Sequence, residues 1–563
     1  MAFQLSPGVN VTEIDLTTIV PAVGTTEGAF VGYFNWGPVN EIVNISNEIE
    51  LVDRFGKPSA NTYESFFTAA NFLSYARNLK VVRAANNLAI LNATGNSQPG
   101  ALISNENDYS QNVYITTALS ADTKFAAKYP GVLGNSLKVD VIANSLNAIA
   151  VYSYGNLYQS MVNTSTYAAG VGGSRDEMHV TVIDEDGLFT GTANTVLETF
   201  AYLSKASDAK TEDGSSNYYV DVLRDRSKYI YATGRGAATW GNPASSYNFG
   251  ANGDVTTSLS NGALDGPTAT NGSLTQAWDK FKNSDEIDVS FLITGNVSAT
   301  VQQYVIDNIA EVRKDALAFV SATRTDVVNV IGQEVTNLTT WRNTTLNRST
   351  SYAVADSAWK YQFDKYNNTY RWVPLNGDLA GLCVRTDFER DPWFSPAGFN
   401  RGQIKNAVKI SWSPTKANRD DLYKIGINPV VSFAGEGVIL YGDKTLLTKP
   451  SAFDRINVRR LFIVLEKAIA RAAKYSLFEF NDEFTRAQFI SLVEPFLRDV
   501  KGRRGIFDFR VVCDTTNNTP EVIDRNEFVG DIYIKPARSI NFIQLNFVAV
   551  RTGVAFEEIV GRF

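Results

Sequence analysis

The stretch from Arg510 to Val550 constrains the fold most, because it contains two strand-like runs around the turn Lys535-Pro536-Ala537-Arg538. Pro536 has no amide hydrogen to donate to a sheet, so it marks where one strand stops. In the run that follows, large apolar side chains fall on both faces, so we expect protein on both sides of this strand. Two interpretations follow. The strand belongs to the sheet of its own chain, or it is shared with the sheet of a neighbouring subunit.

Strands and helices alternate in two other parts of the chain. The runs 28–34 and 79–83 are predicted strands, and the segment 64–76 between them has the apolar spacing of a helix. The order returns with a strand at 287–293, a helix at 301–313 and a strand at 316–320. This β-α-β pattern predicts a parallel sheet covered by helices.

A change of composition separates these two parts. Residues 96–264 are rich in Gly, Ser, Asn, Thr and Tyr, with short strand candidates at 137–142 and 179–183. We therefore predict a β-rich insertion at 96–264 within a middle α/β domain formed by 23–95 and 265–387. Residues 1–22 are too short to hold a core and form a predicted arm.

Residues 388–563 are predicted to form a further domain with two amphipathic helices. The first runs from 456 to 474 and the second carries its apolar stripe from Phe489 to Val500, with a kink at Pro495. A loop is expected at Asn517-Asn518-Thr519-Pro520, ahead of the strand-like runs. The fold class is therefore mixed α/β and multidomain.

Charge and composition restrict the partners. The net charge of −7 argues against nucleic acid as a direct partner. No apolar run reaches the ~18 residues that span a bilayer and no signal segment is recognised, so we expect no membrane insertion. Cys383 and Cys513 lie in strand-like runs and are predicted to be buried, reduced thiols.

No motif indicates catalysis, a cofactor or a metal. His179 is predicted to be a half-exposed strand residue. The run from Asp184 to Gly187 begins like a calcium loop, but Thr195 holds the position of the bidentate glutamate, so a hairpin turn is the better interpretation. In GVILYGDKT (437–445), Asp443 interrupts a phosphate-binding loop. Carboxylates can pair in space, so a carbohydrate-active enzyme stays an alternative.

One helix carries an unusual charge pattern for an acidic chain. Between residues 456 and 474 five positive side chains stand against the single Glu466. The pattern is typical either of a solvated helix face or of a basic ridge that meets an acidic partner. The five residues of this basic ridge are Arg459, Arg460, Lys467, Arg471 and Lys474.

Several longer strings carry a resemblance to a known family. They include LSPGV (5–9), FNWGP (34–38), NLKVVRA (78–84), LSNGALDG (259–266), YQFDKYNNTYRWVPLNGDLAGLCVRTD (361–387), SPAGFNRGQI (395–404), VILYGDKT (438–445) and FDRINVRRLF (453–462). With the stretch 510–550, these strings resemble the tail sheath proteins of contractile-tailed bacteriophages. The resemblance runs nearly end to end and departs most in the insertion.

The resemblance implies a non-enzymatic structural subunit, found in the virion tail and assembled in the host cytoplasm. Such subunits polymerise into a helical sleeve around the tail tube, with baseplate and tail terminator proteins as further partners, and contract to drive the tube through the host envelope for genome delivery. It also implies an inner α+β domain formed by both termini, with the insertion outermost. The alternatives are the sheath of a non-phage contractile injection system and a receptor-binding tail protein.

The family's inter-subunit strands can be carried over to this sequence. The N-terminal arm would use Val9, Val11 and Ile14. The C-terminal strand would use Phe542, Ile543, Leu545 and Phe547. The basic ridge would then face the tube.

Overall fold

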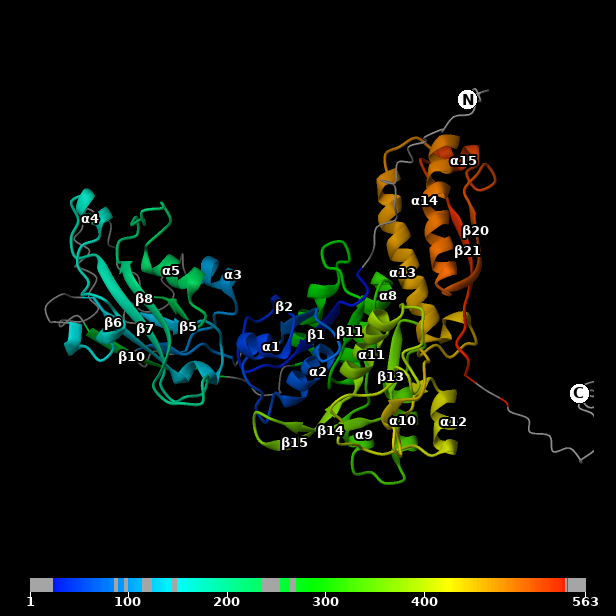
Figure 1. Ribbon diagram of the computed structural model, residues 1–563, viewed down its shortest axis with the longest axis horizontal. Helices are drawn as coiled ribbons and strands as arrows, with labels where there is room; N and C mark the ends of the chain where they lie inside the picture. Colours follow the sequence, from blue (N-terminus) through cyan, green and yellow to red (C-terminus); the bar gives the residue numbers. More distant parts are fainter. Residues whose placement is uncertain are drawn as a thin grey trace, which may run out of the picture.

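The computed structural model describes residues 24–85, 90–95, 100–113, 124–143, 149–233, 254–263, 270–541 and Gln544. Figure 1 shows a β-rich domain on the left, an α/β domain in the centre, and a C-terminal region in which two long helices stand beside a two-stranded sheet. The predicted mixed α/β multidomain fold is confirmed. Within the described residues no helix is both long and apolar enough to cross a membrane.

The middle domain is built on a seven-stranded sheet in which every pair is parallel except β2–β3. Its core strands are buried on both faces, as expected when helices cover a parallel sheet. In sheet order the strands are β17 (Ile427–Asn428), β13 (Ala353–Asp356), β12 (Leu317–Val320), β11 (Phe291–Ile293), β1 (Gly28–Gly32), β3 (Leu79–Arg83) and β2 (Ile42–Ile45).

Helices cover both faces of this sheet. On one face α2 (Tyr63–Leu73) and α11 (Asn376–Glu389) pack against Phe30 and Phe319. On the other, α6 (Asn271–Trp278) and α7 (Ala299–Val305) enclose the small side chains of Ala29 and Ala318. The predicted helix 301–313 is confirmed as α7, a π-helical turn (Ile306–Ala310) and α8 (Glu311–Arg313). Further helices are α1 (Glu48–Phe55), α9 (Arg324–Val327), α10 (Glu334–Thr340) and α12 (Lys416–Lys424).

The middle domain extends past the boundary predicted at residue 388. Strand β17 lies at the edge of the parallel sheet, and Leu446 is buried in the same core. The prediction missed this part because a strand of two residues is too short to reveal a period. The added segments are β16 (Lys409–Ile410), which pairs with the hairpin β14 (Trp359–Asp364) and β15 (Thr369–Pro374), and the hairpin β18 (Val430–Phe433) and β19 (Gly437–Leu440).

The insertion forms a separate antiparallel sheet with its own core. In order its strands are β8 (Thr195–Ser204), β7 (Glu177–Asp184), β6 (Leu137–Ile142), β10 (Asp254–Ser260), β4 (Thr94–Gly95), β5 (Phe125–Ala127) and β9 (Ile230–Ala232). The predicted β-rich character and the hairpin turn after Asp184 are both confirmed. Helices α3 (Glu106–Asp108), α4 (Thr166–Gly170) and α5 (Tyr219–Arg226) accompany the sheet.

Two single residues differ from their predicted setting. His179 is fully buried instead of half-exposed, because Tyr158 stacks on its ring at 4.0 Å, and burial lowers the pKa of its imidazole. Cys383 lies in helix α11, not in a strand. It is nevertheless a buried free thiol, as is Cys513, and burial raises the pKa of Cys383 to about 12.

The C-terminal region contains α13 (Ile456–Ala473), α14 (Glu483–Gly502), β20 (Ile506–Val512), α15 (Pro520–Asp524) and β21 (Asp531–Pro536). Leu461 and Leu465 of α13, Val493 and Leu497 of α14, and Ile506 of β20 share one core. Strand β21 ends at Pro536 as predicted. The expected loop at 517–520 is also present, and its proline starts α15.

Candidate functional site

Strands β20 and β21 form a sheet of two strands within the part of the chain that the structure describes. Phe509, Val511 and Ile532 turn one face towards helices α13 and α14, while Phe507 and Tyr533 on the other face are more than half exposed. A ribbon of two strands is marginal by itself, and its outer backbone groups can pair with another strand. Within the described residues, the edges of this small sheet are therefore places where a further strand could pair.

The seven residues predicted to supply inter-subunit strands lie outside the described residues. They are Val9, Val11 and Ile14 of the N-terminal arm and Phe542, Ile543, Leu545 and Phe547 of the C-terminal run. Their role therefore stays a prediction. The structure does describe the place from which each segment leaves: Gly24 beside the middle domain and Asn541 beyond β21.

The first two arginines of the basic ridge are buried inside the subunit. The Arg459 guanidinium lies 4.0 Å from the ring centre of Phe453 and 4.3 Å from that of Tyr352. Arg460 donates two hydrogen bonds of 2.7 Å to the carboxylate of Asp387 on α11, and both side chains of this pair are at most 5% exposed. Neither arginine offers a free charge at the surface of the subunit.

Burial acts differently on the two partners of the Arg460 ion pair: it raises the pKa of the Asp387 carboxyl, and Arg460 offsets this only in part. Burial by itself would lower the pKa of the Arg460 guanidinium, but the neighbouring Asp387 more than offsets this effect, so the pKa is raised. Removing either partner would leave the other charge buried and unpaired. The pair therefore fastens α13 to α11.

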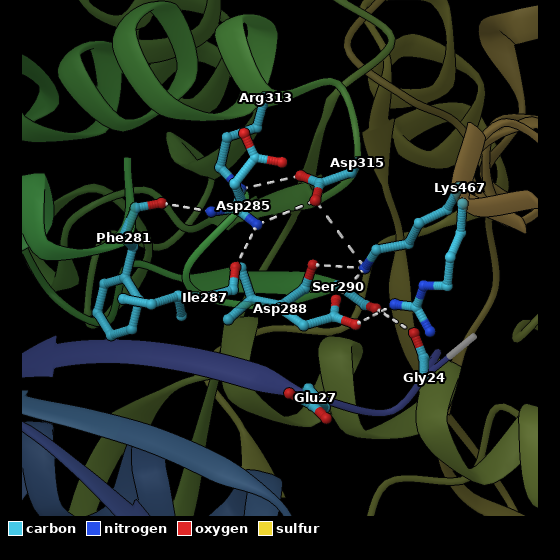
Figure 2. A network of polar contacts seen from close by, with 12 residues as sticks. Gly24, Glu27, Phe281, Asp285, Ile287, Asp288, Ser290, Arg313, Asp315 and Lys467 are labelled. Carbon is cyan, nitrogen blue, oxygen red and sulfur yellow. Dashed lines mark hydrogen bonds and ion pairs between the residues drawn. The ribbon is translucent and has the colours of Figure 1, made fainter. Parts of the chain in front are cut away.

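The other three basic residues meet a loop of the middle domain, and Figure 2 shows this contact for Lys467. Lys467 forms an ion pair with Asp288 and lies 3.9 Å from Asp315. Further along α13, Arg471 reaches Asp288 at 3.3 Å and Lys474 reaches Asp285 at 2.9 Å. The acidic partner of the basic ridge is thus found within the same chain.

The loop that receives Lys467 is itself held in place. Figure 2 shows Arg313 at its centre, donating to the carbonyl oxygens of Phe281 (2.7 Å) and Ile287 (2.8 Å) and pairing with Asp315 at 2.9 Å. Ser290 donates to the carbonyl of Gly24 at 3.2 Å. The start of the described chain, the loop and α13 therefore meet at one joint.

No pattern in the sequence pointed to the acidic partners of α13. Asp285, Asp288 and Asp387 are far from α13 along the chain, and no local spacing links them to it. A second buried pair, Lys360 with Asp378 at 2.8 Å, was also missed, because its residues lie on different elements. These pairs are defined only by the way the elements pack in three dimensions.

The segment that resembles a phosphate loop has another role. Gly437–Leu440 is strand β19, in agreement with the prediction that its spacers are strand-like. The carboxylate of Asp443 accepts hydrogen bonds from Arg455 (3.1 Å) and from the hydroxyl of Tyr423 (3.2 Å). A carboxylate held there would repel a phosphate.

Comparison with known proteins places these features in a family. The chain matches family models described as the phage tail sheath protein central domain (268–446), the phage tail sheath C-terminal domain (448–549) and the tail sheath protein Gp18 domain III N-terminal region (29–84). The central-domain match ends at 446, in keeping with the extended middle domain.

Two relatives match along their whole length. The chain is 34% identical to the tail sheath protein of Vibrio phage KVP40, over 99% of this chain and 100% of that protein. It is 35% identical to the tail sheath protein of Enterobacteria phage T4, over 99% of both chains. The alignment with the first spans 681 positions against 563 residues here, so that relative carries segments that this chain lacks.

Solved structures agree on the fold. The sheath tail protein of Listeria innocua is 13% identical, with a TM-score of 0.54 over 92% of this chain and 96% of that one. That of Desulfitobacterium hafniense is 11% identical, with a TM-score of 0.51 over 94% of this chain and 100% of that one. From these matches, and above all from the full-length identity with two phage sheath proteins, the chain belongs to the phage tail sheath protein family and is a structural subunit of a contractile tail sheath.

Proposed function

We propose that this protein polymerises through strands exchanged between subunits into a helical sleeve around the tail tube. The observation that carries the proposal is the two-stranded sheet β20–β21, which lies immediately before a second strand-like run in the sequence. A strand from a neighbouring subunit would add several backbone hydrogen bonds to this sheet, each worth ~0.5–1.5 kcal/mol. Because donor and acceptor surfaces differ, the contact propagates as a helix.

Exposed apolar side chains at the turn between α13 and α14 support assembly. Five large ones occur between residues 475 and 484, and Phe478 is fully exposed with a left-handed backbone φ of 72°. Single subunits rarely leave such a cluster in water unless another surface covers it. The five are Tyr475, Leu477, Phe478, Phe480 and Phe484.

The sleeve would act without an enzyme site or a cofactor. Subunits stack in a metastable extended state, and a signal from the baseplate releases them to a shorter and wider one. The work comes from better contacts between subunits, and a gain of ~1–3 kcal/mol per subunit becomes large when summed along the sleeve. Tube protein, baseplate and tail terminator proteins are the proposed partners, in a virion tail assembled in the host cytoplasm.

Only the exposed residues of the basic ridge are candidates for contact with the tube. Arg471 and Lys474 are 44% and 66% exposed and could reach a second acidic surface, whereas Arg459 and Arg460 are buried. A test of tube docking therefore belongs at Arg471 and Lys474, because reversing the charge of Arg460 would damage the subunit itself.

Deleting residues 1–14 tests strand exchange. We expect the truncated protein to fold but to form no polymers, because the arm that it would lend is gone. Circular dichroism checks the fold, and negative-stain electron microscopy checks assembly. Normal polymers from the truncated protein would overturn the arm hypothesis.

A matched pair of variants sharpens this test. In an added strand Val9 and Val11 share one face and Asn10 and Thr12 the other. We expect Val9→Asp with Val11→Asp to abolish assembly, since charges would enter an apolar face, while Asn10→Asp with Thr12→Asp leaves it largely intact. Equal effects of the two pairs would argue against a strand.

A further inference from the structure

The C-terminal segment is held at a second place after it leaves the sheet. The amide of Ala537 donates to the carbonyl of Gly505 at 3.1 Å, which is close to the end of β21. Two residues later, the hydroxyl of Ser539 donates to Oδ2 of Asp443 in the middle domain at 2.8 Å. Figure 1 shows the red segment after β21 running away from α14 towards the yellow part of the chain.

Asp443 is held in a position where one carboxylate oxygen can accept the hydrogen bond from Ser539. Its side chain is almost completely buried, and its Oδ1 already accepts from Arg455 and Tyr423. Ser539 supplies a hydrogen bond to the other oxygen. A buried carboxylate oxygen without a donor is costly, so the folded subunit favours the bound position of Ser539.

Arg455 provides the second half of the contact. When the side-chain amide of Asn541 is turned so that its oxygen faces Arg455, that oxygen lies 2.9 and 3.1 Å from the terminal guanidinium nitrogens. Arg455 directly precedes α13, and its position is fixed by Asp443 and by Asp454 at 3.5 Å. Between the two contacts, Ile540 points into solvent and is 81% exposed.

We propose that Asp443, Arg455, Ser539 and Asn541 form a clasp that fixes the direction in which the C-terminal strand leaves the subunit. This inference rests on the proposed function, in which residues beyond 541 pair with a neighbouring subunit. A segment anchored at its base loses less freedom on pairing, and its far end stays within reach of one particular neighbour. The clasp gives Asp443 of the VILYGDKT segment a positioning role in assembly.

The test removes only the clasp residues of the segment itself, in the full-length protein. The variant Ser539→Ala with Asn541→Ala leaves Asp443, Arg455 and the folded body unchanged. In subunits kept dilute and unassembled, we expect trypsin to cleave after the exposed Arg538 about tenfold faster, since hydrogen bonds to charged groups have been lost. The threshold concentration for assembly should rise, while circular dichroism should show that the subunit is still folded.

Two further variants test whether loss of the clasp hydrogen bonds causes the faster cleavage. Ser539→Thr keeps the hydroxyl and should behave as the unaltered protein in both measurements. Adding Asp443→Asn to the double variant should not accelerate cleavage further, because the residues act as a unit. Additive effects would contradict the clasp.

The outcomes separate the two proposals. Cleavage at the original rate in the double variant would overturn the clasp, whatever happens to assembly. Faster cleavage with an unchanged assembly threshold would overturn its positioning role. If the unaltered protein formed no polymers at any concentration, the proposed function would fail, and the cleavage comparison would still decide whether the segment is held.

Discussion

Arg460 and Arg471 lie on the same helix and both pair with aspartates, but water surrounds them to very different degrees. Arg460 and Asp387 are enclosed, whereas the side chain of Arg471 is 44% exposed and shares Asp288 with Lys467. A buried pair leaves an uncompensated charge when one partner is lost, while an exposed pair is replaced by hydration. The two residues should therefore differ sharply in their contribution to stability.

We expect Arg460→Ala to lower the free energy of unfolding by about 3 kcal/mol or more, because Asp387 would remain buried without its partner. Arg471→Ala is the matched control on the same helix and should cost at most ~1 kcal/mol. Urea denaturation of both variants, compared with the unaltered protein, measures the difference. Similar losses for the two would show that burial does not decide the strength of these pairs.

Among the elements, helix α14 is unusual because it contains a proline in its interior. Pro495 lies within Glu483–Gly502, where it cannot donate to the carbonyl of Ser491 one turn earlier. The helix forms all the same, because Val493, Leu497 and Val500 bury an apolar stripe on both sides of the proline. Tertiary packing here outweighs local propensity.

The variant Pro495→Ala should stabilise the C-terminal region by about 1–3 kcal/mol, since it restores an amide donor and removes a steric clash. Pro495 is exposed, so the change creates no cavity. Ser491→Ala, at an exposed position one turn earlier, is the control and should change stability by only a few tenths of a kcal/mol. Thermal unfolding followed by circular dichroism would contradict the argument if Pro495→Ala melted earlier than the unaltered protein.

At the scale of the whole molecule, the middle domain contacts the insertion and the C-terminal region through different kinds of interaction. Fully buried Arg83 links the middle domain to the insertion. It donates to the carbonyl of Gly37 in the middle domain (2.7 Å) and to that of Pro130 in the insertion (2.8 Å). The C-terminal region is held by ion pairs along α13, and several of these are partly exposed. The two-stranded sheet β20–β21 lies at one end of the subunit and the insertion at the other (Figure 1).

This arrangement predicts how the purified protein behaves as its concentration rises. If each subunit both lends and accepts a strand, as we propose, hollow striated tubes of uniform width are expected above a threshold concentration and dispersed subunits below it. Negative-stain electron microscopy over a concentration series makes the measurement. Discrete closed particles at every concentration would mean that the termini fold back on their own subunit, and the receptor-binding alternative would then have to be reconsidered.

Local patterns in the sequence were enough to predict much of the fold. The β-α-β alternation led to the parallel sheet, the change of composition to the insertion, and the 3.6-residue period to α13 and α14. These predictions succeeded because period and turn chemistry are set by neighbouring residues. Cys383 shows the limit: its short apolar run fits a strand or a buried helix equally well, and packing under the sheet decided for the helix.

The sequence by itself thus determined most of the longer elements, the resemblance to a family and the change in composition that marks the insertion. Only the tertiary structure decided which charges meet. The charge pattern of the basic ridge fitted either a solvated helix face or a surface that meets an acidic partner. In the structure, four of its five residues pair with Asp387, Asp288 and Asp285 of the same chain. Asp443 looked like a defect in a phosphate loop, yet it holds Ser539. Ion pairs and buried hydrogen bonds depend on distances in space between residues far apart in the chain, and no local period records those distances.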